Sequence, residues 1–309
     1  MNTTAEPAVR KRAQRNTKVA RIGDVRTRVL DVDGGGPTVL LIHGFTESAD
    51  GWRSVLDLLG EQGHRCAAVD LPHFGRAARP VAAGYLSMVH DFIAAAVRQF
   101  DRGEGVVLVG NSVGGLAVLH AAQDTDLPLV AAVAIGPAGL YTTWWMRLVR
   151  RVGPATDWLL GLPVRPMFRG TVTAPALIST GFARAVASGR LTPEAKAQYA
   201  SHWGPGDLRR QLLLGGETIA ELSRPDALGN ERFVVPVTAA WGSKDWVCPP
   251  RGAKALRNKH PDAMLRFIDG SGHCPQYDQP ARVAEIIRAA IADALSCRAV
   301  STTVQEKLS

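Results

Sequence analysis

A series of short apolar runs, each bounded by glycine, proline or polar residues, constrains the fold of this chain more than any other feature. Six of these runs have the composition of buried β-strands, and they begin at Thr38, Arg65, Val106, Val130, Pro236 and Ala263. Four amphipathic segments of helical length accompany them, at residues 52–59, 85–100, 113–123 and 280–295. Strands that alternate with helices predict an α/β fold, in which a mostly parallel sheet carries helices on both faces.

Two earlier stretches, at residues 18–22 and 26–32, alternate polar with apolar side chains. This period is typical of an antiparallel hairpin at the edge of a sheet, because one face meets the core and the other meets water. Together with the six buried runs, the hairpin predicts a sheet of eight strands.

The interval 138–231 interrupts this alternation, since it contains no convincing strand and is rich in tryptophan, arginine, leucine and glycine. Its helix-like segments are 142–152, 156–160, 175–187, 193–201 and 208–221. An insertion late in a parallel sheet is expected above the carboxyl ends of the strands, where open α/β sheets bind ligands. We therefore expect a core of residues 17–137 and 232–297 with an inserted helical cap, residues 138–231.

The two ends of the chain differ from this core. Residues 1–16 are polar and basic without apolar periodicity, which predicts a disordered arm, and residues 298–309 are expected to form a flexible tail. The net charge is +8, but the basic arm has no aromatic residue that could stack on bases. Nucleic acid is therefore not an expected partner.

The cellular location is inferred from what the sequence lacks. No apolar run approaches the roughly 20 residues that span a bilayer, and no signal-peptide pattern follows the basic arm, so a cytoplasmic location is expected. The four cysteines show no CxxC spacing, and reduced thiols are the simplest expectation.

The segment Gly110-Asn111-Ser112-Val113-Gly114 fits the pattern G-x-S-x-G, between an apolar run and an amphipathic segment. In this context the pattern predicts a sharp strand-to-helix turn that exposes a serine hydroxyl, with glycines where side chains would collide. A glycine-rich helix entry capped by Ser112 is the alternative. Ser112 is the candidate nucleophile.

A serine hydroxyl needs a base within hydrogen-bonding reach and a third group that orients the base. His273 follows the last predicted strand on a glycine-rich loop and is the candidate base. Asp245 follows the strand that begins at Pro236, lies between Ser112 and His273 in the chain, and is the candidate acid. Asp269 and Asp278 are rivals, but their closeness to His273 in sequence favours turn or capping roles.

Negative charge that develops on an acyl oxygen during attack needs preorganised N–H groups. The loop His43-Gly44-Phe45-Thr46 follows the first buried strand. It is expected to present the backbone N–H of Phe45 beside that of Val113, and these two groups are the candidate oxyanion hole. His43 is expected to be structural. The chemistry of these residues requires neither a metal nor a cofactor.

Several motifs resemble the α/β-hydrolase superfamily, over about two-thirds of the chain and excluding the cap. They are LLIHGF, AVDLPHFG, LVGNSVGG, WGSKDWVCPP and GSGHCPQYDQP, in the order that the superfamily has them. The resemblance implies a capped serine hydrolase, similar to carboxylesterases, lipases and carbon–carbon hydrolases of aromatic ring-cleavage products, with the roles given above. The HGFTES loop is also similar to that of epoxide hydrolases and haloalkane dehalogenases, which use an aspartate where this chain has Ser112. His73, Ala77 and Ala78 depart from the superfamily's usual DLPGFGxS.

Apolar side chains of the predicted cap suit an acyl chain or an aromatic substrate, and the candidates are Trp144, Trp145, Met146, Phe168, Phe182 and Trp203. Packing of the cap onto the core is the alternative for each. Arg147, Arg150 and Arg151 stand beside these tryptophans, and together they suit peripheral contact of the cap with an anionic membrane surface.

Three functions fit these residues. The favoured one is a metal-independent serine esterase that cleaves a small-molecule carboxylic ester through an acyl-enzyme. The second is a carbon–carbon bond hydrolase that uses the same triad on a vinylogous diketone. The third is a non-catalytic receptor that binds a small apolar ligand on a hydrolase scaffold. A series of ester and diketone substrates separates the three.

Overall fold

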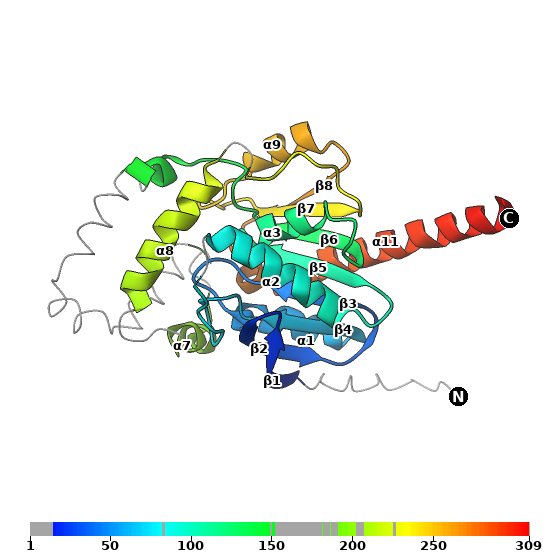
Figure 1. Cartoon of the computed structure of the whole chain (residues 1–309), viewed down its shortest axis with the longest axis horizontal. Helices are drawn as coiled ribbons and strands as arrows, with labels where there is room; N and C mark the ends of the chain where they lie inside the picture. Colours follow the sequence, from blue (N-terminus) through cyan, green and yellow to red (C-terminus); the bar gives the residue numbers. More distant parts are fainter. Residues whose placement is uncertain are drawn as a thin grey trace, which may run out of the picture.

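The computed structural model describes residues 15–81, 84–148, 150–151, 181, 186, 191–201, 207–224 and 227–308. Its centre is a sheet of eight strands: β1 (Arg15–Ile22), β2 (Val25–Val32), β3 (Gly35–Ile42), β4 (His64–Val69), β5 (Val106–Asn111), β6 (Leu129–Ile135), β7 (Val237–Gly242) and β8 (Met264–Ile268) (Figure 1). Their order is β1-β2-β4-β3-β5-β6-β7-β8. Only the β1–β2 and β2–β4 pairs are antiparallel, so the predicted eight-stranded, mostly parallel sheet is confirmed.

Helices cover both faces of the sheet, as the α/β prediction requires. Around it lie η1 (Ala49–Trp52), α1 (Arg53–Gly60), α2 (Tyr85–Phe100), α3 (Val113–Ala121), α9 (Gly252–Lys259), α10 (Pro275–Asp278) and α11 (Pro280–Leu308). Successive residues of β3 show the two cores. Leu40 and Ile42 belong to the cluster formed with α2 and α3, whereas Val39 and Leu41 belong to the cluster formed with α1 and α11. Because strand side chains alternate, one buried strand contributes to both cores.

The parallel strands end at one edge of the sheet. Ile42 of β3 pairs with Gly110 of β5, Asn111 pairs with Ile135 of β6, and Gly242 of β7 pairs with Ile268 of β8. The loops that follow these strands therefore meet at the same place, although up to about two hundred residues separate them in the chain.

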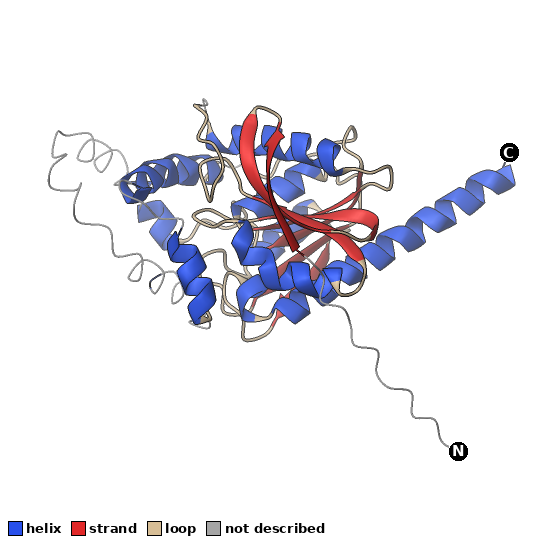
Figure 2. Ribbon diagram, turned by 90° about the horizontal axis from the view of Figure 1, so that it is seen from below, coloured by secondary structure: helices blue, strands red, loops and turns tan. Residues whose placement is uncertain are grey.

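Both ends of the core differ from the prediction. The first strand begins at Arg15, whose guanidinium pairs with Asp57 at 3.0 Å, so residues 15 and 16 belong to the sheet and not to the arm. Residues 298–308, expected to form a flexible tail, continue α11, which projects from the body (Figure 2). No glycine or proline follows Pro280 in the sequence. No helix-breaking residue therefore interrupts α11. Among the described helices, none combines the length and apolarity that a membrane span requires.

The segment between β6 and β7 contributes helices but no strand among its described residues. Residues 144–148 form a helical turn, followed by α7 (Pro193–Ser201) and α8 (Asp207–Leu222), close to the predicted 193–201 and 208–221. Figure 1 shows α7 and α8 beyond the carboxyl ends of the central strands. The predicted helix 156–160 and most of 175–187 lie outside the described residues.

Candidate active site

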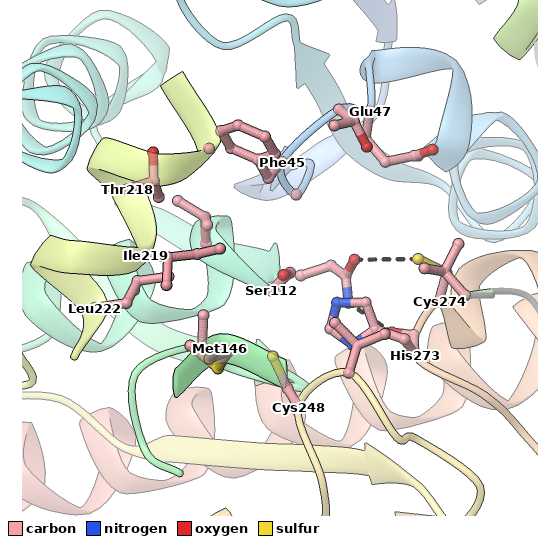
Figure 3. Close-up of a pocket in the computed structure, with 18 of the residues that line it drawn as sticks. Phe45, Glu47, Ser112, Met146, Thr218, Ile219, Leu222, Cys248, His273 and Cys274 are labelled. Carbon is pink, nitrogen blue, oxygen red and sulfur yellow. Dashed lines mark hydrogen bonds between the residues drawn. The ribbon is translucent and has the colours of Figure 1, made fainter. Parts of the chain in front are cut away.

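Ser112 stands at the tight turn between β5 and α3, with φ 58 and ψ −118. A non-glycine residue at positive φ costs about 1–3 kcal/mol, and it persists only where its surroundings enforce it. Here the neighbouring glycines allow close approach, because a Cβ at Gly114 would lie 2.6 Å from the carbonyl oxygen of His43, and one at Gly110 would overlap the Gly114 carbonyl. The predicted strand-to-helix turn is present, and Ser112 lines a cavity at its tip (Figure 3).

His273 lines the same cavity, on the loop between β8 and α10. Its Nδ1 lies 2.8 Å from Oδ2 of Asp245, and both side chains are buried. The other oxygen of Asp245 accepts hydrogen bonds from the backbone N–H groups of Val247 (2.9 Å) and Cys248 (2.8 Å). The carboxylate is therefore held on the Nδ1 side of the ring. This arrangement makes Nδ1 the donor and leaves Nε2 as the basic nitrogen.

The two rival carboxylates have other partners. Asp269 accepts a hydrogen bond from Ser243 Oγ at 3.0 Å, and Asp278 accepts one from the backbone N–H of Gly272 at 2.7 Å. Both bonds shape the loop around His273, which agrees with the expected turn roles. Asp245 alone among the three lies against the imidazole.

The candidate oxyanion loop is a turn in which the N–H of Glu47 donates to the carbonyl of Gly44 at 3.3 Å. Phe45 and Val113 both line the cavity that contains Ser112. His43, at the end of β3, is fully buried; its Nε2 accepts the N–H of Leu71 at 2.8 Å, and its Nδ1 lies 2.7 Å from the Gly44 carbonyl. Both ring nitrogens of His43 thus have backbone partners, which supports the structural role expected for it.

The cavity has a volume of about 230 Å³. Of the expected substrate-binding residues, Trp145 and Met146 line it, but Trp144 is 75% exposed and does not. Neighbours on one helical turn face different directions, so the turn that brings Met146 inward leaves Trp144 in solvent. Phe168, Phe182 and Trp203 lie outside the described residues. Sequence reasoning missed further apolar lining residues of α8, which are Ile219 and Leu222.

Asn111, directly before the nucleophile, is a buried residue that sequence reasoning did not single out. Its Nδ2 donates to the carbonyls of Ile135 (3.1 Å) and His273 (3.0 Å), and its Oδ1 accepts from Gln276 Nε2 (3.2 Å). The amide therefore fastens the base loop to the end of β5. Its only sequence signal is its place as the variable residue of G-x-S-x-G.

Glu47 was missed as well, although it lines the cavity and is only 3% exposed. Its Oε2 accepts a hydrogen bond from Tyr277 Oη at 2.8 Å. Burial raises the pKa of Glu47 to about 8, the hydrogen bond from Tyr277 opposes this shift, and the charge of Asp50 adds to it. An acidic residue in an otherwise apolar loop, HGFTES, was the available signal.

Two thiols, those of Cys248 and Cys274, also line the cavity. Burial raises the pKa of Cys248 well above the ordinary thiol value; the charge of Asp245 adds to this and a hydrogen bond with Ser112 opposes it. Burial also raises the pKa of Cys274. Because the thiolate is the reactive form, neither cysteine competes with Ser112 as a nucleophile at neutral pH.

The described cysteines Cys66, Cys248 and Cys274 are unpaired. The described residues contain no cluster of three or more His, Cys, Asp or Glu side chains that could hold a metal ion.

Comparison with known proteins agrees with the observed fold. The model of the alpha/beta hydrolase fold family matches residues 37–280. An uncharacterized protein of Mycobacterium tuberculosis is 27% identical over 273 residues, which cover 84% of this chain and 76% of the relative. A pimeloyl-[acyl-carrier protein] methyl ester esterase of Xanthomonas campestris pv. campestris is 29% identical over 273 residues, 85% of this chain and 98% of the esterase.

A solved structure has the same architecture. The serine hydrolase involved in carbazole degradation, the CarC enzyme, superimposes with a TM-score of 0.69 over 90% of this chain and 99% of that one. At 19% sequence identity, this likeness extends to the fold alone.

Proposed function

Because the chain belongs to the alpha/beta hydrolase fold family, we propose that it is a serine hydrolase that cleaves a carboxylic ester through Ser112, His273 and Asp245. The buried 2.8 Å contact between His273 and Asp245, on the wall of the cavity that Ser112 lines, is the observation that carries this proposal. The likeness to a methyl ester esterase supports an ester as the substrate.

The first step of the proposed reaction uses all three groups. Ser112 Oγ attacks the ester carbonyl while Nε2 of His273 takes its proton, and Asp245 stabilises the imidazolium that forms. The backbone N–H groups of Phe45 and Val113 donate to the oxyanion of the tetrahedral intermediate. Return of the proton from His273 to the alcohol oxygen releases the alcohol and leaves an acyl-enzyme on Ser112. Water, deprotonated by His273, then frees the acid by the reverse sequence.

The lining of the cavity supports an apolar acyl or aromatic group. Met146, Ile219 and Leu222 contribute apolar side chains to the cavity. Ile219 and Leu222 lie across it from His273, and Met146 lies between Leu222 and Cys248 (Figure 3). All three come from the segment between β6 and β7, so we propose that residues 138–231 act as the cap that defines the acyl site.

The outer side of this cap supports a second proposal, contact with an anionic membrane. Trp144 and Leu148 of the cap expose 75% and 51% of their surface. Trp246, from the loop after β7, exposes 53% and lies edge-on to Trp145 with ring centroids 6.5 Å apart. Arg147, Arg150 and Arg151 are exposed beside them. Indole rings with neighbouring guanidinium groups are the combination that binds anionic bilayer surfaces.

Initial rates on p-nitrophenyl esters of increasing chain length test the ester proposal. Ser112→Ala is expected to lower kcat by about 10⁴-fold to 10⁶-fold, because removing the nucleophile leaves only binding and oxyanion stabilisation. Ser54→Ala, at an exposed position of α1, is the matched control and is expected to keep wild-type rates. EDTA in every assay excludes rates from contaminating metal.

The other outcomes separate the alternatives. Cleavage of a vinylogous diketone without cleavage of any ester contradicts ester hydrolysis and favours carbon–carbon bond hydrolysis. Ester turnover that survives Ser112→Ala contradicts the assigned nucleophile.

A further inference from the structure

The turn that carries Phe45 contains a strained residue. Thr46 has φ 63, in the left-handed region that a β-branched side chain strongly disfavours. The closing bond of the turn, from the N–H of Glu47 to the carbonyl of Gly44, is long at 3.3 Å. A turn of this kind keeps its shape only if contacts from outside hold it.

Glu47 makes such a contact. Its Oε2 accepts the 2.8 Å hydrogen bond from Tyr277 in α10, four residues after His273. Gly51 leaves room for this bond, because a Cβ there would lie 2.5 Å from Glu47 Oε2 and 2.9 Å from Tyr277 Oη. In Figure 3, Glu47 lies on the opposite side of the cavity from Ile219 and Leu222. The bond thus joins the strained turn directly to the loop of the base.

We propose that Glu47 is a positioning residue for ester hydrolysis, and that its bond with Tyr277 holds the turn carrying Phe45 in register with the loop carrying His273. The inference rests on the proposed ester chemistry. Asn111 already fastens the base loop to the nucleophile turn, so the Glu47 bond closes the connection among all three loops. A displacement of about 1 Å between reacting groups can cost about 100-fold in rate.

The surroundings of Glu47 hold it as a neutral acid. The titratable and charged groups around it are Asp50 of η1, Cys274 and Tyr277 at α10, Tyr199 of α7, and Arg28 and Arg53, which both pair with Asp50. No cation is paired with Glu47 among the described residues, and its Oε1 has no hydrogen-bond partner there. Burial, first of all, raises the pKa of Glu47 to about 8. Above that pH, an unpaired negative charge arises in the wall of the cavity where the oxyanion must form.

The pH dependence of kcat/KM on p-nitrophenyl acetate, from about pH 5.5 to 9.5, tests the role directly. Wild type is expected to lose activity as Glu47 ionises near pH 8. Glu47→Gln keeps a hydrogen-bond donor and acceptor but cannot ionise. Its kcat/KM is therefore expected to stay within about 3-fold of the wild-type value at pH 7 and to show no decline at alkaline pH. The kcat/KM of Glu47→Ala is expected to be about 10-fold to 100-fold below that of wild type at every pH.

Two further variants sharpen the result. Tyr277→Phe removes the bond that lowers the pKa of Glu47, so its alkaline decline is expected at higher pH than in wild type. Glu61→Gln, at an exposed position after α1, is the control and is expected to keep the wild-type profile. A side chain that served only folding would lower activity in these variants without moving the decline.

Thermal unfolding supplies a readout that needs no catalysis. The pKa of Glu47 is higher in the folded than in the unfolded chain, so the folded state binds the proton more tightly. As the pH rises from about 5 to about 8, wild type is therefore expected to lose stability relative to Glu47→Gln, and the difference in Tm is expected to level off above pH 8.

The outcomes distinguish this inference from the proposed function. Ester turnover by wild type together with an alkaline decline that persists in Glu47→Gln, or full activity of Glu47→Ala, overturns the role of Glu47 and leaves ester hydrolysis standing. A Tm difference that does not change with pH overturns the neutral buried acid. Absence of ester turnover by wild type overturns both proposals.

Discussion

The cavity above Ser112 has two walls that are held by different kinds of interaction. On one side, the loops that follow β3, β5, β7 and β8 are joined by buried hydrogen bonds, such as those of Asn111 and Asp245. On the other side, Met146 and α8 meet the cavity through apolar side chains. Hydrogen bonds are directional and hold the bonded groups in place to within a fraction of an ångström. Apolar contacts, by contrast, tolerate replacement of one side chain by another of different shape. We therefore propose that the chemistry resides in the first wall and the choice of substrate in the second.

One polar contact shows how α8 is attached to the core. Oε2 of Glu221, near the end of α8, accepts the backbone N–H of Leu86 at 3.0 Å, in the first turn of α2. The carboxylate thus satisfies a free donor at a helix N-terminus, where negative charge is favourable. This bond orients α8 over the core without fixing the individual side chains that face the cavity.

After loss of the nucleophile itself, the largest expected effect comes from the hydrogen-bonded wall. Asp245→Asn is expected to lower kcat on p-nitrophenyl esters by about 10³-fold to 10⁴-fold, because an amide stabilises the wrong tautomer of His273 and cannot stabilise an imidazolium. Burst kinetics and steady-state rates measure the effect. Asp269→Asn, in the exposed turn that follows β8, is the control, and its kcat is expected to stay within about 2-fold of wild type. A loss of less than 10-fold in Asp245→Asn sinks the assignment of the acid.

A smaller and selective effect is expected from the apolar wall. Met146→Ala and Leu222→Ala enlarge the cavity beside Ser112, so the ratio of kcat/KM for octanoate over acetate esters is expected to rise about 10-fold. Rates on the acetate ester are expected to change by only about 3-fold, because the catalytic loops keep their bonds. Leu148→Ala removes an exposed side chain from the same turn and serves as the control. Equal losses on every chain length contradict the division between the two walls.

The sequence predicted those parts of the molecule that local patterns encode. Apolar runs identified the central strands because burial on both faces leaves a continuous signal. The run at Ala263 also formed a strand, but the expectation that it would be buried was wrong, because β8 is the edge strand and most of its residues are exposed. The candidate triad, by contrast, followed from motif and chain order, and its assignment stays a prediction until Ser112 and Asp245 are substituted. A flexible tail was expected at residues 298–309, whereas α11 continues to Leu308 because no glycine or proline interrupts it.

The positioning contacts could not be predicted, because they join distant parts of the chain. Asn111 reaches His273 across 162 residues and Glu47 reaches Tyr277 across 230. No periodicity or spacing marks such pairs, since their partners are chosen by the convergence of strand ends. Trp144 and Met146 illustrate the same limit over a shorter distance. Their composition is equally apolar, and only the packing of one helical turn decides that Met146 faces the cavity and Trp144 faces solvent.

The smallest effect on soluble esters is expected from the outer face of that turn. Trp144→Ala and the double variant Arg147→Ala/Arg151→Ala are expected to hydrolyse p-nitrophenyl acetate at wild-type rates, because these side chains do not line the cavity. Their partition onto phosphatidylglycerol vesicles is expected to fall about 5-fold to 30-fold at low salt, since each arginine near an anionic surface contributes about 1 kcal/mol. Vesicle sedimentation measures the partition, and Val19→Ala, an exposed apolar residue of β1, is the matched control. The basic residues 1–14 are common to every variant and cancel in the comparison. If all variants bind as wild type does, the arm carries the attraction and the outer face of the cap has no part in membrane contact.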